Sequence, residues 1–250
     1  EILVSFGAAG IERGIAIINP TEGQWVDSEQ VNMILSQAGL KTWKLYESVP
    51  DSHDLREELY QHMDTVSSKN ISTNMVLPID QHFNVKGVGL VAIGYVQSGT
   101  VNKHDEVVIL PAKETGVVRS LQVMDDDVDS AIAGDRVGVA LRNLREESLH
   151  RGCMIIHPES QALIRHDNSK IKIKTAPFQK RKLTNEDVIH AAVDLQFVVG
   201  RIKRVDGDSI SVEWENPLWI RAEGSPEILI TQLDAMPMRI IGRVETIEQA

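Results

Sequence analysis

The sequence is poor in cysteine, since Cys153 is the only one among its 250 residues. A single thiol excludes an intrachain disulfide and also a cluster of thiolates around a metal. A chain without disulfides suits a reducing compartment, so we expect a cytoplasmic location. We expect Cys153 itself to be a small buried hydrophobic residue rather than a nucleophile.

The sequence also lacks any apolar run close to the roughly 20 residues that a membrane-spanning helix needs, so we expect no membrane segment. The first residues, Glu1-Ile2-Leu3-Val4-Ser5-Phe6, have no basic region followed by a cleavage site, so we expect no signal peptide in them. They are typical of a strand that is entered midway, and no initiator methionine precedes them. We therefore expect that the natural protein has further sequence before Glu1.

Positive charge is in deficit, because 26 Lys and Arg stand against 36 Asp and Glu, for a net charge of −10. This balance excludes a protein that coats nucleic acid electrostatically, but it leaves room for a local basic patch that contacts RNA. The eight His residues show no metal-ligand spacing. The acidic run Asp125–Asp129 resembles a calcium loop only superficially, because Ser130 and Arg136 stand where that loop requires Gly and Glu. We expect a solvated loop and no metal site.

Residues 1–70 have the pattern of an α/β unit. Continuous apolar runs are expected for strands that are covered on both faces, and apolar residues at helical spacing are expected for the helices between them. The predicted order is strand, helix, strand, helix and a polar linker: Ile15–Ile18, Asp27–Gly39, Leu40–Tyr46, Ser52–Met63 and Thr65–Asn74.

From Met75 onward the sequence changes to short Val-, Ile- and Leu-rich runs separated by Gly, Asp, Asn and Pro, the pattern of an all-β barrel or sandwich. The first group of predicted strands is 75–79, 89–96, 106–110, 116–123, 136–141 and 153–156. The second group is 171–174, 193–202, 209–214, 227–231 and 238–244. We therefore predict a mainly β chain with two successive small β-barrels, over 75–158 and 160–250.

A long ordered series of residues in the first barrel carries a family resemblance. The series is Leu77-Pro78-Ile79, Phe83, Gly87-Val88-Gly89, Gly94-Tyr95-Val96, Ser98-Gly99-Thr100-Val101, Asp105-Glu106-Val107, Ala133-Gly134-Asp135-Arg136-Val137-Gly138-Val139, Leu141-Arg142-Asn143, Arg151-Gly152 and Pro158. In this order and spacing it resembles the second domain of the translational GTPases: elongation factor Tu, elongation factor 1-alpha and the selenocysteine-specific elongation factor. His104 stands where the family usually has Gly, and we expect a left-handed or turn conformation there.

The resemblance implies that residues 160–250 correspond, more loosely, to the third domain of these factors. It also implies that residues 1–70 are a truncated or degenerate α/β GTPase-like domain, in which Ala16–Gly23 resembles the strand and turn that precede the helix after the second switch. The predicted fold is therefore this fragment followed by elongation-factor domains 2 and 3.

A GTPase of this family needs a glycine-rich loop ending in Gly-Lys-Ser/Thr to hold the phosphates and Mg²⁺, and the sequence contains none. Gly7-Ala8-Ala9-Gly10 continues with Ile11-Glu12-Arg13 instead, so we expect an ordinary turn. Asn102-Lys103-His104-Asp105 spells the guanine-specifying motif, but the family register places it in a hairpin turn of the barrel. The family position, after Leu40–Tyr46, is Glu47–Asp51, and the motif is absent there. These 250 residues should not hydrolyse GTP, and GTP and Mg²⁺ would be cofactors only of a longer chain with an intact GTPase domain.

In carriers of aminoacyl-tRNA, a pocket on the first barrel holds the terminal adenosine and the esterified amino acid. The resemblance carries that pocket onto Asp80, Gln81, Gln122, Met124, Asp125 and Arg136. Here Gln122 replaces a carboxylate, Met124 replaces a stacking ring and Asp125 replaces an Arg, which weakens the expectation of conventional aminoacyl recognition. The alternative is an inherited barrel that binds no such ligand.

A basic stretch in the second barrel is the other candidate for RNA-backbone contact: Lys170, Lys172, Lys174, Lys180, Arg181 and Lys182. The alternative interpretation is an edge strand whose exposed lysines discourage aggregation. Taken together, the sequence favours a translation-factor-like protein that binds tRNA, the ribosome or another translation factor. Two other hypotheses stay open: a GTP-binding elongation factor whose catalytic segments lie outside these residues, and a protein-interaction module without RNA.

Overall fold

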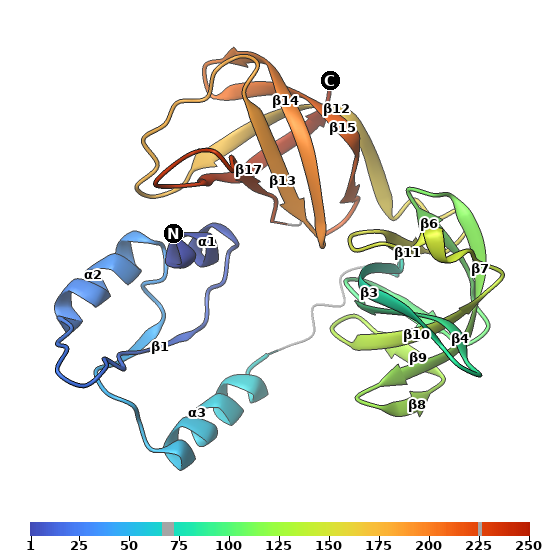
Figure 1. The fold of residues 1–250 in the computed structure, drawn as a ribbon, viewed down its shortest axis with the longest axis horizontal. Helices are drawn as coiled ribbons and strands as arrows, with labels where there is room; N and C mark the ends of the chain where they lie inside the picture. The colour runs from blue at the N-terminus through green and yellow to red at the C-terminus, as the bar shows by residue number, and fades with distance from the viewer. Residues whose placement is uncertain (67–72, 225–226) are drawn as a thin grey trace.

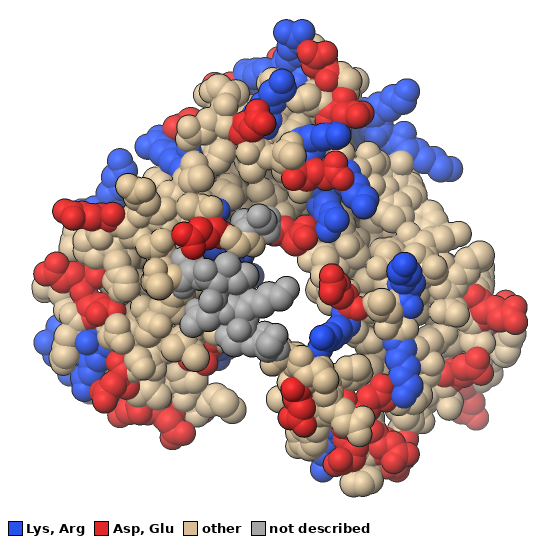
Figure 2. All heavy atoms as spheres, turned by 180° about the vertical axis from the view of Figure 1, so that it is seen from behind, with Lys and Arg blue, Asp and Glu red and all other residues tan. Residues whose placement is uncertain are grey.

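A computed structural model describes residues 1–66, 73–224 and 227–250. Three parts follow one another along the chain, an α/β unit and two β-barrels, and they lie around a central opening (Figures 1 and 2). The mainly β fold class with two successive small barrels is therefore confirmed. None of the helices in the described residues is long and apolar enough to cross a bilayer.

The α/β unit contains the elements α1 (Ile2–Ala8), β1 (Ile15–Ile17), α2 (Ser28–Gln37), β2 (Lys44–Tyr46) and α3 (Ser52–Asp64). The strands β1 and β2 pair in parallel, as the strand–helix–strand order predicts. Asp27 caps α2 through its side chain, and Gly39 follows the helix with a φ of 85°. Asp51 caps α3 by accepting a hydrogen bond from the His53 backbone N–H through its side chain.

The prediction of a strand at Glu1–Phe6 is wrong, because Ile2–Ala8 forms the helix α1. Val4 and Ala8, four residues apart, are buried, and Val4 packs in one cluster with Leu35 and Ala38. A short apolar run has no periodicity that separates a strand from a buried helix, and its packing partners decide between them.

The first barrel is a ring of six strands, ordered β10-β4-β3-β11-β6-β7 and closed by pairing of β7 with β10. Its strands are β3 (Val76–Val85), β4 (Gly89–Tyr95), β6 (Glu106–Leu110), β7 (Glu114–Val123), β10 (Arg136–Arg142) and β11 (Met154–Ile156). The sequence did not predict three further short strands: β5 (Thr100–Asn102), β8 (Asp126–Val128) and β9 (Ser130–Ile132). β8 pairs with β7, and β5 and β9 pair with each other in a separate two-stranded sheet. A 3-10 turn at Glu146–Ser148 precedes β11.

The second barrel closes in the order β12-β15-β14-β13-β16-β17. Its strands are β12 (Leu163–Thr175), β13 (Val188–Val193), β14 (Gln196–Asp206), β15 (Ser209–Arg221), β16 (Leu229–Thr231) and β17 (Ile240–Gln249). The predicted single strand 193–202 is wrong, because the chain turns at Asp194 and Leu195, which have φ angles of 44° and 65°. Such a two-residue turn usually contains Asn or Gly, and Asp-Leu gave no such signal.

Each barrel has its own apolar core, and apolar contacts join the parts. Val76 and Met154 of the first barrel pack in one cluster with Ala162, Leu163 and Trp219. The α/β unit contacts the second barrel, since the cluster around Val4 includes Ala176, Met238 and Ile240. The chain between the α/β unit and the first barrel includes 67–72, so most of the linker predicted at 65–74 lies outside the described residues.

Candidate functional site

A groove of about 740 Å³ crosses the outer surface of the first barrel. Outward-facing side chains of β3, β4, β7 and β10 form its floor, together with the turn after β7. We call this surface the barrel-1 groove; it is lined by Phe83, Val85, Val88, Val91, Ile93, Lys103, His104, Arg119, Ser120, Gln122, Met124, Asp125, Asp127, Arg136, Gly138, Ala140 and Arg142.

Gly138 keeps part of the groove floor open. A Cβ atom at this position would meet nothing closer than the Gln122 carbonyl oxygen at 3.9 Å. The absent side chain therefore leaves space rather than relieving a clash, and Ala140 continues the small-residue floor on the same strand. Phe83, at 41% exposure, supplies an aromatic surface in the same groove.

Four cationic side chains line the groove: Lys103, Arg119, Arg136 and Arg142. Arg119 is held in place, because its guanidinium donates to the carbonyl oxygens of Val88 and Gly87, the latter at 3.4 Å. Two carboxylates, Asp125 and Asp127, lie in the same lining. The groove thus has an excess of positive charge on a chain whose net charge is −10. Figure 2, by contrast, shows basic and acidic side chains mixed on the barrel at the top of that view.

Of the predicted aminoacyl-pocket residues, Gln122, Met124, Asp125 and Arg136 line the barrel-1 groove. Gln122 donates through Nε2 to Asp127 Oδ1 at 2.9 Å. Met124 and Asp125 form the turn after β7 with φ angles of 52° and 68°, and Met124 is 90% exposed. The structure thus gathers these residues around one turn and its neighbouring strand β10.

The other two predicted pocket residues, Asp80 and Gln81, do not line the groove. Asp80 instead accepts a hydrogen bond from Arg151, and the two side chains form an ion pair. The pairing of β3 with β4 shifts register between Ile79 and Gln81. Such a bulge redirects the side chains around it, and sequence alignment alone does not reveal it.

Four lining residues, Phe83, Lys103, Arg119 and Arg142, were not expected in the pocket. Phe83, Arg119 and Arg142 lie on strands with alternating burial, where every second residue faces outward. Once the strands are assigned, that alternation places them outside the barrel. Which outward positions gather in one groove depends on the pairing of β7 with β10, which joins segments distant in sequence.

The basic stretch of the second barrel divides between different surfaces. Lys170, Lys172 and Lys174 are exposed and alternate with Ile171 and Ile173, as predicted. Their strand is not an edge strand, because β12 pairs with both β15 and β17; that interpretation is wrong.

Lys180, Arg181 and Lys182 line a separate hollow of about 570 Å³. Arg181 lies 3.6 Å from Asp187 and 3.8 Å from Asp234, so part of this positive charge is already compensated within the chain. The barrel-1 groove therefore brings its cationic side chains together on one surface, whereas the basic stretch of the second barrel does not.

The two stretches that resemble nucleotide motifs in sequence, Gly7–Gly10 and Asn102–Asp105, make contacts within the chain. Gly7 and Ala8 end the helix α1, and Gly10, with a φ of 71°, lies beside the Glu227 side chain, which would repel a phosphate. Asp105 Oδ2 accepts from the Asn102 backbone N–H at 2.7 Å and lies 3.0 Å from His157 Nε2. The carboxylate of the apparent guanine motif is thus engaged in its own turn. The expected turn conformation of His104 is confirmed by its φ of 74°.

Cys153 is fully buried in the first core, as predicted. Burial raises the pKa of its thiol to about 11, so the thiol is protonated at neutral pH and unsuited to nucleophilic chemistry. No cluster of three or more potential metal-ligating His, Cys, Asp or Glu side chains occurs among the described residues.

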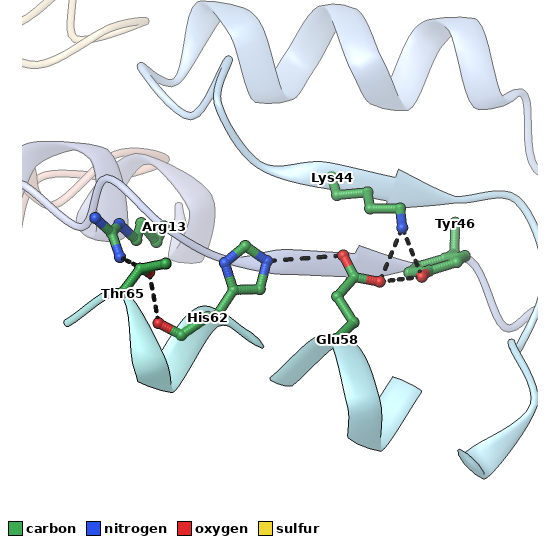
Figure 3. A network of polar contacts seen from close by, with 6 residues as sticks. All are labelled: Arg13, Lys44, Tyr46, Glu58, His62 and Thr65. Carbon is green, nitrogen blue, oxygen red and sulfur yellow. Dashed lines mark hydrogen bonds and ion pairs between the residues drawn. The ribbon is translucent and has the colours of Figure 1, made fainter. Parts of the chain in front are cut away.

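A polar network fastens α3 to the parallel strands (Figure 3). Lys44 Nζ donates to Glu58 Oε2 and to the Tyr46 hydroxyl, both at 2.8 Å, and Tyr46 also donates to Glu58. His62 Nε2 lies 3.7 Å from Glu58 Oε1. Hydrogen bonds from Lys44 and then Tyr46 lower the pKa of Glu58, and the hydrogen bond to Glu58 raises the pKa of Lys44. The network is exposed and has a structural role.

Comparison with known proteins extends these observations. Residues 89–156 match the family model described as elongation factor Tu domain 2. A selenocysteine-specific elongation factor of Methanocaldococcus jannaschii is 30% identical over 216 residues, covering 78% of this chain and 46% of that protein. An uncharacterized protein of the same organism is 28% identical over 218 residues, covering 87% of this chain and 67% of that protein.

Solved structures show the same fold over the whole chain. Translation elongation factor SelB from Methanococcus maripaludis, in its apo form, superposes with a TM-score of 0.80 at 24% identity, covering 100% of this chain and 59% of that one. A bacterial selenocysteine-specific elongation factor gives a TM-score of 0.77 at 20% identity, covering 96% of this chain and 40% of that one. The chain thus spans about half the length of these factors, and its resemblance to the elongation factors of translation is confirmed.

Proposed function

We propose that this chain, similar to translation elongation factors over most of its length, acts in translation by binding the 3′ end of a tRNA in the barrel-1 groove. The observation that carries the proposal is the meeting of four cationic side chains, an open glycine floor and an exposed aromatic ring in one groove. Single-stranded RNA ends are recognised by this combination of backbone charge and base stacking.

Each part of the groove has a role in this proposal. Arg136 and Arg142, on the same strand, and Lys103 in the neighbouring turn supply positive charge for phosphate oxygens. Phe83 offers its ring to a base, and Gly138 lets the base or ribose approach the sheet closely. Asp125 and the Asp127–Gln122 pair lie in the same groove, with Gln122 opposite Gly138, and supply hydrogen-bond acceptors for sugar hydroxyls or base edges.

Two residues of the groove differ from those that the resemblance to aminoacyl carriers implies. Because Met124 and Asp125 replace the ring and the Arg that the aminoacyl carriers have, the bound tRNA need not be held as those carriers hold it. We therefore assign the groove to the RNA end itself and leave the esterified amino acid outside the proposal.

The experiment is a binding titration of fluorescent tRNA against the 250-residue chain over a salt series. Wild type should bind more tightly as salt falls, with the slope set by the number of phosphates contacted, about 0.7 per contact for a single strand. The double variant Arg136→Glu/Arg142→Glu should lose about tenfold or more in affinity and show a shallower slope.

The matched control is Lys41→Glu/Arg56→Glu, which changes charge equally at two exposed positions of the α/β unit. This control should leave the affinity close to wild type. Equal losses in the two variants would show that only net charge matters, and no binding by wild type at low salt would refute the proposal.

A further inference from the structure

The second barrel has a strand edge that its own strands leave open. β12 pairs with β17 along Gly242–Gln249, whereas β16 pairs only with Ile240, Gly242 and Arg243. The backbone N–H of Val244 still reaches the Ile228 carbonyl oxygen at 2.8 Å. Beyond it, no strand of the described chain pairs with Glu245–Gln249 on the side away from β12.

A cavity of about 830 Å³ lies along this open edge, a size typical of ligand sites. We call it the β17 slit. It is lined by Ile164, His166, Ile220, Arg221, Ala222, Glu227, Ile228, Arg243, Val244, Glu245, Thr246, Ile247, Glu248 and Gln249. Five aliphatic side chains, Ile164, Ile220, Ile228, Val244 and Ile247, give it apolar walls. An apolar side chain that enters the slit would be removed from water and would contact these walls.

A buried polar chain ends at this slit. Trp214 donates through Nε1 to Ser169 Oγ at 2.9 Å, and Ser169 Oγ lies 3.2 Å from His166 Nδ1. The Ser169 hydroxyl, which accepts from the indole, can donate its own proton to Nδ1, and in that arrangement the neutral ring carries its proton on Nε2. His166 is 3% exposed and lines the slit, and its Nε2 is not one of the fully buried, unpartnered polar atoms of the described residues. The imidazole edge can therefore reach a ligand in the slit.

The charge of the slit favours a cationic ligand. Arg221 is paired with Asp194 at 2.8 Å, and Arg243 with Glu227 at 3.2 Å. Glu245 and Glu248 are exposed, and neither forms an ion pair with a described residue. Lys170 lies opposite Glu248 in the pairing of β12 with β17 but is not part of the slit lining. Because both lining arginines are paired within the chain, the lining itself repels phosphate and attracts Lys or Arg side chains.

We propose that the β17 slit binds an extended, basic peptide segment of a partner protein, which adds a strand to the free edge Glu245–Gln249. The peptide backbone pairs with the edge, as in other cases of strand addition, and one of its carbonyl oxygens accepts from His166 Nε2. Alternate side chains then point in two directions: apolar ones into the slit, and basic ones toward Glu245 and Glu248.

The test uses a short acetylated and amidated synthetic peptide of alternating Val and Lys, titrated against the 250-residue chain. Fluorescence anisotropy should show saturable binding. A peptide with Glu in place of every Lys should bind about tenfold or more weakly, because it faces the two carboxylates. A Val/Lys peptide that is N-methylated on one edge keeps its charge and side chains but cannot pair with a strand, and it should also bind about tenfold or more weakly.

Variants of the chain locate the site. Glu245→Lys/Glu248→Lys should abolish most of the binding, while Glu57→Lys/Glu215→Lys, with the same change in charge at exposed positions elsewhere, should leave it unchanged. In amide NMR spectra the peptide should shift signals of Glu245–Gln249 and the Nε2 proton of His166.

Three results would overturn the proposal. The first is the absence of saturable peptide binding, and the second is equal binding by the N-methylated peptide, which would indicate charge attraction alone. The third is a set of shifted signals that excludes Glu245–Gln249.

Discussion

The two barrels have the same architecture but present opposite chemistry to a ligand. The first barrel closes fully and offers an outer groove with four cationic side chains over a glycine floor. The second leaves part of β17 without a second strand partner among the described residues and offers a slit lined by Glu245, Glu248 and the largely buried imidazole of His166. A shared ring of six strands therefore does not determine what each barrel binds; the outward positions and the length of one strand do.

The α/β unit differs from both barrels in how it is held. The barrels bury continuous cores, whereas α3 contains no buried residue, and its apolar residues Leu59 and Met63 are 47% and 66% exposed. Its connection to β1 and β2 is mainly polar, through the network of Lys44, Tyr46 and Glu58. We expect α3 to be the part of the described chain that opens most easily.

The largest expected effect is the loss of stability when alanine replaces a glycine of the first barrel. Two of these glycines look alike in sequence but have different roles. A Cβ at Gly94 would lie 2.2 Å from the Pro78 carbonyl oxygen, a clash with backbone, whereas a Cβ at Gly138 meets nothing closer than 3.9 Å. Gly94→Ala should destabilise the first barrel by about 3 kcal/mol, at the upper end for overpacking. Gly138→Ala should change stability by less than about 0.5 kcal/mol and weaken RNA binding.

Chemical denaturation and the tRNA titration together check this pair. If Gly94→Ala were as stable as wild type, the close contact of β3 with β4 would be refuted. If Gly138→Ala left tRNA affinity unchanged, the open floor would have no part in binding.

The next effect is a pH dependence of the free energy of unfolding, to which His166 of the second barrel contributes. Burial lowers the pKa of His166, so the folded chain binds a proton at this ring less readily than the unfolded chain does. The stability from the neutral ring is present above the ordinary His pKa of about 6.5 and is lost as pH falls below it. For one proton the slope cannot exceed about 1.4 kcal/mol per pH unit.

Denaturation of wild type and His166→Gln between acidic and neutral pH tests this assignment. Below the ordinary His pKa, the free energy of unfolding of the variant should depend less on pH than that of wild type. A slope identical in the two proteins would show that His166 does not titrate with unfolding. Ser169→Ala serves as a second variant, because it removes the partner of Nδ1 and leaves the ring in place.

The smallest effect concerns α3. Glu58→Gln removes the charge that Lys44 and Tyr46 contact, so the amides of α3 should exchange hydrogen faster while those of the barrels stay as slow as in wild type. High salt should have the same effect on wild type in a weaker form, because the Lys44 side chain is 53% exposed but that of Glu58 only 16%. Unchanged exchange in the variant would mean that other contacts hold the helix.

Much of the fold could be predicted because local patterns and a long family series agree. The alternation of Ile171 and Ile173 with lysines, and the Gly-rich series from Leu77 to Gly138, indicate strands by their residue pattern alone. The errors arose where tertiary contacts decide: the helix at Ile2–Ala8 depends on packing against Leu35 and Ala38, and the Asp194-Leu195 turn lacks the usual residues.

The candidate site was harder to predict than the fold. Gln122, Met124, Asp125 and Arg136 were found through the resemblance, but Asp80 and Gln81 lie outside the groove because of a bulge in β3. Arg119 and Arg142 join the groove only through the pairing of β7 with β10, which no local pattern reveals. The unpaired edge of β17 likewise follows from the shortness of β16, a property of the partner strand.

Amide NMR during titration with a CCA-ended minihelix tests most directly whether the barrel-1 groove receives an RNA end. Signals of Gln122, Gly138 and Ala140 should shift together and saturate, while those of Glu245–Gln249 stay in place. Saturating shifts confined to the second barrel, with the groove signals unmoved, would contradict RNA binding in the groove.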